Sequence, residues 1–132
     1  MIYAQHWRQM LEDVSRRASE EACGLVAGWE GHSQAVYPIA NSLHSPVRFL
    51  MEPAEQVASL LDMEDHGWEL LAIYHSHPCG PTAPSSTDVA ESYYPGTAQL
   101  IWFPMDDGWS CRAFLIHQGL VTEFPLRIAP DR

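Results

Sequence analysis

A nearly continuous apolar run, residues 68–74, leads directly into the sequence His75-Ser76-His77-Pro78. A run without polar alternation is typical of a strand that is buried on both faces, as in the sheets of α/β proteins. Residues i and i+2 of a strand point to the same face, so the rings of His75 and His77 should face one place. The sequence therefore predicts a central strand that ends at a site, because open α/β sheets place their sites at this edge.

Helical and strand-like patterns flank this run on both sides. Apolar residues at helical spacing predict a helix from Tyr3 to Ala18. Glu52-Pro53 opens a second helix, which Gly67 should end. The expected apolar stripe of this second helix consists of Val57, Leu60 and Leu61. A short helix is expected near residues 85–88, and further strands at 23–29, 34–39, 98–103, 110–117 and 120–128. This order predicts one α/β domain, residues 1–132, with a mixed β-sheet flanked by helices.

Composition excludes several classes of function. The net charge is −10 with only 7 Lys and Arg residues, which leaves no basic surface for nucleic acid. No apolar run is long enough to span a bilayer, and no secretory signal is apparent at the start of the sequence. The three cysteines, Cys23, Cys79 and Cys111, lack C-x-x-C spacing. An odd number of isolated cysteines favours a reducing, cytoplasmic location over a disulfide framework.

The pattern H-x-H-x7-S-x2-D, from His75 to Asp88, contains the parts of a metal site. Zinc accepts imidazole nitrogen and carboxylate oxygen, and His75, His77 and Asp88 would leave a fourth position open for water. Two simpler interpretations remain open at this point. Ser85-x-x-Asp88 is also the pattern of a helix capping box, and H-x-H pairs occur without metal. Glu21 is the candidate proton acceptor, although spacing alone favours a solvated helix end for Glu20 and Glu21.

Taken together, these segments resemble the JAMM (MPN-plus, Mov34/MPN/PAD-1) metalloprotease family, in its prokaryotic stand-alone form. The resemblance covers nearly the whole chain, and the segments that carry it are Glu21-x-x-Gly24, Gly24–Gly28, Trp68–Tyr74, His75-x-His77-Pro78, Ser85-x-x-Asp88, Tyr94-Pro95-Gly96 and Cys111–Phe114. It implies a cytidine-deaminase-like α/β fold and one zinc ion per chain. It further implies that His75, His77 and Asp88 are the metal ligands, that Glu21 is the general base, and that Ser85 helps to hold the oxyanion or the water.

The activity implied by the resemblance is zinc-dependent hydrolysis of a peptide or isopeptide bond. The expected substrate is the C-terminal tail of a ubiquitin-like β-grasp sulfur-carrier protein, for example in the release of cysteine. A tail of this kind could bind in an extended form along a sheet edge. The alternative is a non-catalytic binding or scaffold domain of the same fold, but such domains typically lack the ligands that are intact here. A zinc deaminase is disfavoured because H-x-E and P-C-x-x-C are missing.

Cys79 follows the H-x-H-P segment directly, at a position where relatives commonly carry a polar residue. One interpretation is a partly buried loop thiol without a special role. The other is an alternative thiolate ligand or an oxidation-sensitive switch beside the metal.

Overall fold

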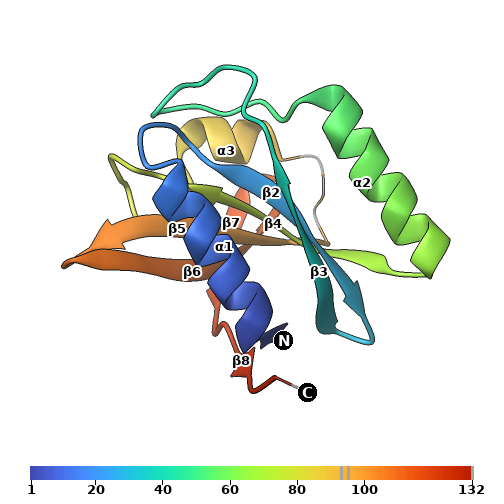
Figure 1. The fold of residues 1–132 in the computed structure, drawn as a ribbon. Helices are drawn as coiled ribbons and strands as arrows, with labels where there is room; N and C mark the ends of the chain where they lie inside the picture. Colours follow the sequence, from blue (N-terminus) through green and yellow to red (C-terminus); the bar gives the residue numbers. More distant parts are fainter. Residues whose placement is uncertain (93, 95, 132) are drawn as a thin grey trace.

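The computed structural model describes residues 1–92, 94 and 96–131, so Pro95 of the resembling segment Tyr94-Pro95-Gly96 lies outside the described residues. Within the described part, one mixed sheet has the strand order β3-β2-β4-β5-β6-β7 (Figure 1). Its strands are β2 (Cys23–Trp29), β3 (His32–Ile39), β4 (Glu69–Ser76), β5 (Ala98–Met105), β6 (Gly108–His117) and β7 (Leu120–Phe124). The β4–β5 pair is parallel and its neighbours are antiparallel. The apolar run 68–74 therefore forms an interior strand, as predicted.

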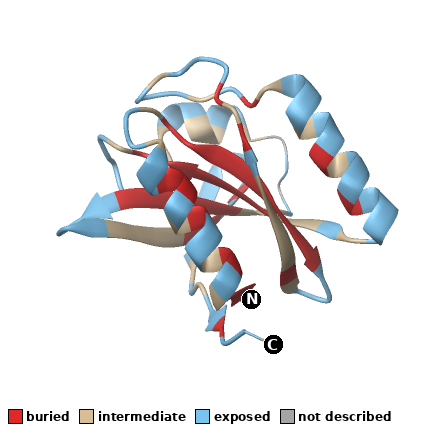
Figure 2. Ribbon diagram, in the orientation of Figure 1, coloured by how far each residue is buried: buried red, intermediate tan, exposed pale blue. Residues whose placement is uncertain are grey.

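Helices cover both faces of this sheet. Helix α1 (Ala4–Arg16) packs on one face, where Met10 and Val14 are fully buried in a cluster with Trp102. Helix α2 (Pro53–His66) packs on the other face, where Met63 joins a cluster with Leu25. The short helix α3 (Ser86–Ala90) follows the histidine segment. Figure 2 shows that burial concentrates in the middle strands. Each large apolar side chain buried there contributes about 1.5–3 kcal/mol.

The ends of α2 are as predicted, but its orientation is not. The Glu52 side chain accepts a hydrogen bond from the Glu55 amide, and Gly67 has the left-handed φ of 72° that ends the helix. The expected apolar stripe is right only for Leu60, which packs against the core, and wrong for Val57 and Leu61, which are 54% and 55% exposed. The buried residues of the helix are Ser59 and Met63, and Leu60 packs beside Met63. Two hydrogen bonds hold the helix in this rotation: Tyr37 on β3 donates to Asp62, and the amide of Ala40, which directly follows β3, donates to the Glu55 carboxylate.

The C-terminal segment also differs from its prediction. The strand expected over 120–128 is interrupted, because β7 ends at Phe124, directly before Pro125. Proline has no amide hydrogen to continue the ladder. The chain then forms β8 (Ile128–Ala129), which pairs in parallel with β1 (Ile2–Tyr3), a strand that was not predicted. No helix in the described ranges is long and apolar enough to cross a membrane.

Candidate metal centre

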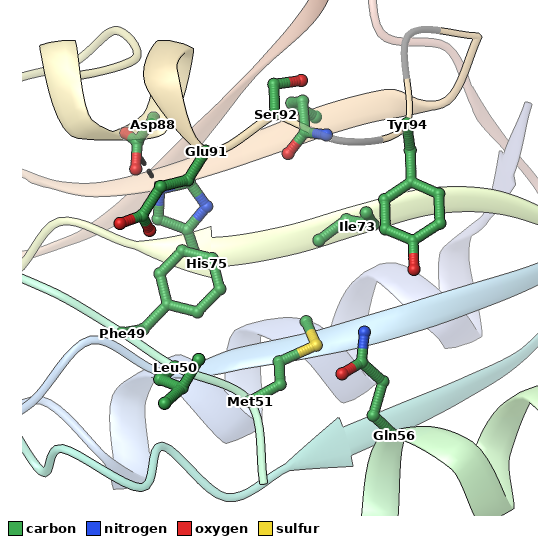
Figure 3. A pocket seen from close by; sticks show the side chains of 11 residues that line it. Phe49, Leu50, Met51, Gln56, Ile73, His75, Asp88, Glu91, Ser92 and Tyr94 are labelled. Carbon is green, nitrogen blue, oxygen red and sulfur yellow. Dashed lines mark ion pairs between the residues drawn. The ribbon is translucent and has the colours of Figure 1, made fainter. Parts of the chain in front are cut away.

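The predicted metal ligands converge at the carboxyl end of β4. The Nε2 atoms of His75 and His77 lie 3.0 Å apart, and the Asp88 Oδ2 atom lies 3.2 Å and 3.0 Å from them. Figure 3 shows the Asp88 carboxylate above the His75 ring. Glu21 joins the same place, since ligand atoms of Glu21, His75 and His77 all lie within 4.8 Å of one another. Residues from the end of β4, from α3 and from the segment before β2 thus meet at one point.

Both histidines are buried and held in place. The His75 ring stacks on Phe49 at a centroid distance of 4.6 Å. The His77 amide donates to the Trp102 carbonyl at 2.7 Å, and His77 Nδ1 lies 2.8 Å from the Pro81 carbonyl oxygen. Since that oxygen can only accept, Nδ1 carries the hydrogen, and Nε2 of the neutral ring presents its lone pair to the centre. This is the orientation that a metal ligand needs.

The capping box and the metal site use the same two residues. The Asp88 amide donates to the Ser85 hydroxyl oxygen at 3.1 Å, and the Ser85 amide donates to Asp88 Oδ2 at 2.8 Å. The capping-box interpretation is therefore confirmed, and it aims the Asp88 carboxylate at the imidazoles. The Ser85 oxygen accepts in this box, so its hydroxyl hydrogen remains available to donate.

Burial and the mutual contacts set the charges of this group. Burial raises the pKa of Asp88, but its polar contacts with the two imidazoles outweigh this effect, so that the net shift is downward. Burial lowers the pKa of His75. Burial also acts to lower the pKa of His77, but its bonds to Asp88 and to the Pro81 carbonyl raise it above the ordinary value. The centre therefore holds an ionised carboxylate between two imidazoles, of which one has a lowered pKa and the other a raised pKa.

Glu21 lies beside this centre with only 4% of its surface exposed. Its amide donates to the Ser45 carbonyl at 2.7 Å, and the next amide, that of Ala22, donates to the Ser76 hydroxyl at 2.8 Å. Burial raises the pKa of Glu21 to about 7, a shift that nearby His77 opposes and Asp88 reinforces. The solvated-helix-end interpretation of Glu21 is therefore wrong. A carboxyl group tuned near neutral pH is suited to both accepting and releasing a proton.

Asn41 holds this region together, and sequence reasoning missed it. The side chain is fully buried. Its Nδ2 donates to the Glu21 and Arg48 carbonyls at 3.0 Å each, and its Oδ1 accepts from the amides of Leu43 and Leu50. The loop that follows β3 is thereby tied to Glu21. An asparagine in a polar loop has the sequence pattern of an ordinary turn residue, so no signal distinguished it.

Arg112 on β6 is a second residue that was not singled out. Its guanidinium donates to the Thr82 carbonyl at 3.1 Å and to the Thr82 hydroxyl at 2.8 Å, and it pairs with Glu123 on β7. Thr82 directly follows Pro81, the residue whose carbonyl accepts from His77. Arg112 therefore braces the loop that orients a predicted ligand. The segment Cys111–Phe114 had pointed to this strand without assigning the arginine a role.

Close packing explains why a glycine occupies the last position of Glu21-x-x-Gly24. A Cβ atom on Gly24 would lie 2.3 Å from the Tyr74 ring on β4. The Tyr74 hydroxyl donates to Asp13 at 2.6 Å, and Arg17 pairs with the same carboxylate while donating to the Cys23 carbonyl. This buried network joins the end of α1 to the start of β2, on either side of Glu21.

Cys79 is exposed, so the expectation of a partly buried thiol is wrong. Among the described residues, the group of side chains that could hold a metal contains Glu21, His75 and His77 and does not include Cys79. Cys23 is buried on β2, and Cys111 is half-buried on β6.

A cleft of about 180 Å³ extends from the centre across the α2 side of the sheet. His75 and Asp88 line one end of it (Figure 3). Its walls are mainly apolar and contain Phe49, Leu50, Met51, Ile73 and Tyr94, together with the amides of Gln56 and Gln99. The predicted metal ligands thus lie at one end of a groove that can hold a substrate segment.

Two histidines and a carboxylate that meet beside a second, buried carboxylate define an open metal site of the hydrolytic class. Residues 3–118 match the family described as prokaryotic homologs of the JAB domain (Prok-JAB), and the chain belongs to this family. The resemblance to stand-alone JAMM proteins is therefore confirmed, and the protein is a hydrolase of the JAMM type.

Two curated relatives align over most of the chain. A probable TtuB-protein conjugate cleaving protease from Thermus thermophilus is 37% identical over 85% of this chain and 75% of its own length. A CysO-cysteine peptidase from Mycobacterium tuberculosis is 31% identical over 97% of this chain and 90% of its own length.

Solved structures agree with the observed fold. The solution structure of a protein from Desulfitobacterium hafniense has a TM-score of 0.87 and 31% identity, covering 98% of this chain and 92% of that one. A JAB1/MPN domain protein from Archaeoglobus fulgidus has a TM-score of 0.61 and 18% identity, covering 97% of each chain. The second likeness concerns the fold alone, and it confirms the predicted α/β class with a mixed sheet and flanking helices.

Proposed function

We propose that this protein is a zinc-dependent peptidase that cuts the bond following the C-terminal tail of a ubiquitin-like sulfur-carrier protein. The observation that carries the proposal is the convergence of His75, His77 and Asp88 within 3.2 Å, beside the buried Glu21. The relatives support this substrate class, since their names refer to conjugates of TtuB and to a bond between CysO and cysteine.

The donor set fits zinc. Two imidazole nitrogens and one carboxylate oxygen are ligands that catalytic zinc accepts, and they leave a position open. The lone pair of His77 is already directed inward by the bond from Nδ1 to Pro81. We assign one zinc ion per chain to His75, His77 and Asp88. When bound, zinc would supply polarisation of the scissile carbonyl and acidification of a water molecule.

The chain's own groups supply the proton transfers and the hydrogen bonds. Glu21, with a pKa near 7, would take a proton from the attacking water and deliver it to the leaving amine. The free hydroxyl hydrogen of Ser85 would donate to the oxyanion, an interaction often worth a few kcal/mol. Asn41 and Ser76 hold the backbone around Glu21 and act as positioning residues.

The cleft beside the centre supports a peptide tail as the ligand. Its lining extends from His75 past Ile73 to Gln56 (Figure 3). A groove of about 180 Å³ can hold a short extended segment but not a folded domain. We propose that residues 1–132 act as one peptidase domain. The free cysteines in the structure support the expected cytoplasmic location.

The decisive experiment combines metal content with hydrolysis. Elemental analysis of the purified protein should find about one zinc per chain, and His77→Ala or Asp88→Ala should lose it. A fusion of TtuB to a C-terminal reporter peptide should be cleaved by the wild type. Glu21→Gln should retain the zinc and lose cleavage. If Glu21→Gln cleaves as fast as the wild type, the proposed mechanism is wrong. If the wild type binds zinc but cleaves no carrier fusion, the non-catalytic alternative is favoured.

A further inference from the structure

An ion pair joins the loop before α2 to the end of α3, close to the metal ligands. Arg48 Nη2 donates to Glu91 Oε1 at 2.6 Å, and the two side chains are 58% and 39% exposed. Glu91 lines the cleft together with His75 and Asp88 (Figure 3). We propose that Arg48 binds the free α-carboxylate of the residue that hydrolysis releases, so that the enzyme favours removal of a single C-terminal amino acid. This inference rests on the proposed function and adds to it the recognition of the leaving group.

The backbone of Arg48 lies between a contact to Glu21 and a contact to His75. The carbonyl of Ser45, three residues earlier, accepts from the Glu21 amide at 2.7 Å. Phe49, the next residue, stacks on the His75 ring at a centroid distance of 4.6 Å. The loop therefore carries Arg48 past the proposed general base and onward to a predicted metal ligand.

This position is on the leaving-group side of the centre. The tail of the carrier would occupy the cleft, which is lined by His75, Ile73 and Gln56. Because the scissile bond lies at the metal, the released residue must continue beyond His75, away from Gln56. Glu21 delivers its proton to the amine of that residue. Arg48 stands on the loop that contacts Glu21, so its guanidinium is placed to meet the released residue.

The chemistry of the leaving group then determines whether Arg48 has a partner. In a single amino acid, one carbon atom separates the amine from the carboxylate. The side chain of a lysine in a conjugated protein brings no anion so close to the scissile bond. Guanidinium groups bind carboxylates through paired, charge-assisted hydrogen bonds, and Glu91 already occupies Arg48 in this way. Exposed ion pairs contribute little stability, so an incoming carboxylate can replace Glu91 at low cost.

The charge of the chain makes a cation at this place useful. The sequence has 7 Lys and Arg residues against 17 Asp and Glu residues. Asp88 at the centre and Glu91 beside it both repel an anionic leaving group. Arg48 offsets this repulsion for a substrate with a free α-carboxylate, whereas a substrate without that group gains nothing from the arginine.

The test compares two substrates that differ in one chemical group. Both are CysO, the carrier in the name of the Mycobacterium tuberculosis relative, extended by one C-terminal cysteine. This cysteine ends in a free carboxylate in the first substrate and in a carboxamide in the second. The measured quantity is the ratio of kcat/KM for the free acid to kcat/KM for the amide, in which a general loss of activity cancels. The control variant is Arg8→Gln, which breaks the exposed ion pair between α1 and Asp131.

We expect the wild type to favour the free acid by about tenfold or more. Arg48→Gln should remove most of this preference, and Arg48→Lys should keep part of it. Glu91→Gln should increase the preference, because Arg48 loses its competing carboxylate. Arg8→Gln should keep the ratio of the wild type.

The two partners of the ion pair should therefore change the ratio in opposite directions. Equal falls in Arg48→Gln and Glu91→Gln would mean that the pair only holds the loop to α3, and this result would overturn the proposal. A wild type that cleaves the free acid and the amide equally well would overturn it too, while leaving the proposed function intact.

Binding gives a readout that does not depend on cleavage. The zinc-loaded Glu21→Gln variant should bind the free acid more tightly than the amide, and adding Arg48→Gln should remove most of this difference. If the wild type cleaves neither substrate, the proposed function fails. The role of Arg48 is then decided by this binding measurement alone. Equal affinities for the two substrates, or no binding of either, would overturn it.

Discussion

Replacing Glu21 by glutamine should have opposite effects on stability and on activity. The pKa of Glu21 is raised from 4.5 to about 7 in the folded protein, mainly by burial. Below the unfolded value both states hold the proton, and the group contributes no pH dependence. Between 4.5 and 7 the folded state binds more protons than the unfolded state, so stability falls as the pH rises. A pKa shift of this size lowers the free energy of unfolding by about 3 kcal/mol above pH 7.

Glutamine cannot ionise, so the free energy of unfolding of Glu21→Gln should not fall in this way as the pH rises. The assay is urea unfolding of chelator-treated wild type and variant at about pH 5 and about pH 8.5. The difference between the two proteins isolates Glu21, because the other titrating groups are common to both. The variant should gain roughly 2–3 kcal/mol over the wild type between these conditions. The same variant, loaded with zinc, should lose about 100-fold or more in kcat.

Parallel pH curves for the two proteins would refute this reasoning. They would mean that Glu21 ionises in the folded protein much as it does in the unfolded chain. A carboxylate of that kind would be a weak proton donor to a leaving amine near neutral pH.

Three further substitutions test the supports of the centre. Arg112→Gln should weaken zinc binding by about tenfold, because the loop that orients His77 loses its hydrogen bonds from the arginine to Thr82. Competition for zinc with a chromophoric chelator would measure this change in affinity. Gly24→Ala should cost about 3 kcal/mol of stability, since the new methyl group would collide with the Tyr74 ring. Unfolding in urea should show that loss, and an unchanged midpoint would contradict the packing argument. Asn41→Ala should cost at least about 3 kcal/mol and also lower kcat, because it leaves buried backbone groups unpaired.

The sequence was sufficient to predict the residues that meet at the centre. Because His75 and His77 are two residues apart on an apolar strand, their side chains point to the same face. This part of the prediction follows from strand geometry alone. Bringing Glu21 to the same place depends on the pairing of β2 with β4, in which Cys23 lies opposite His75. Spacing alone could not supply that register. The resemblance to a known family did.

Other features depend on contacts that no local pattern contains. Val57 and Leu61 have the spacing of a buried stripe, yet hydrogen bonds to β3 rotate α2 so that they face outward. The pairing of β8 with β1 joins segments from the two ends of the sequence, and strands of two residues carry almost no periodic signal. Asn41 matters because of the five groups around it, all of which are brought to it by the fold.

The centre is assembled from two parts of unequal rigidity. His75 and Ser76 belong to an interior strand, and their amides should exchange with solvent only when the whole sheet opens. Asp88 stands on a helix of five residues without a buried side chain, a segment that can open by itself. Metal exchange should therefore proceed through release of Asp88 while the histidines stay in place. The lifetime of the bound ion would then report the local opening of α3, and chelators should remove it without unfolding the protein.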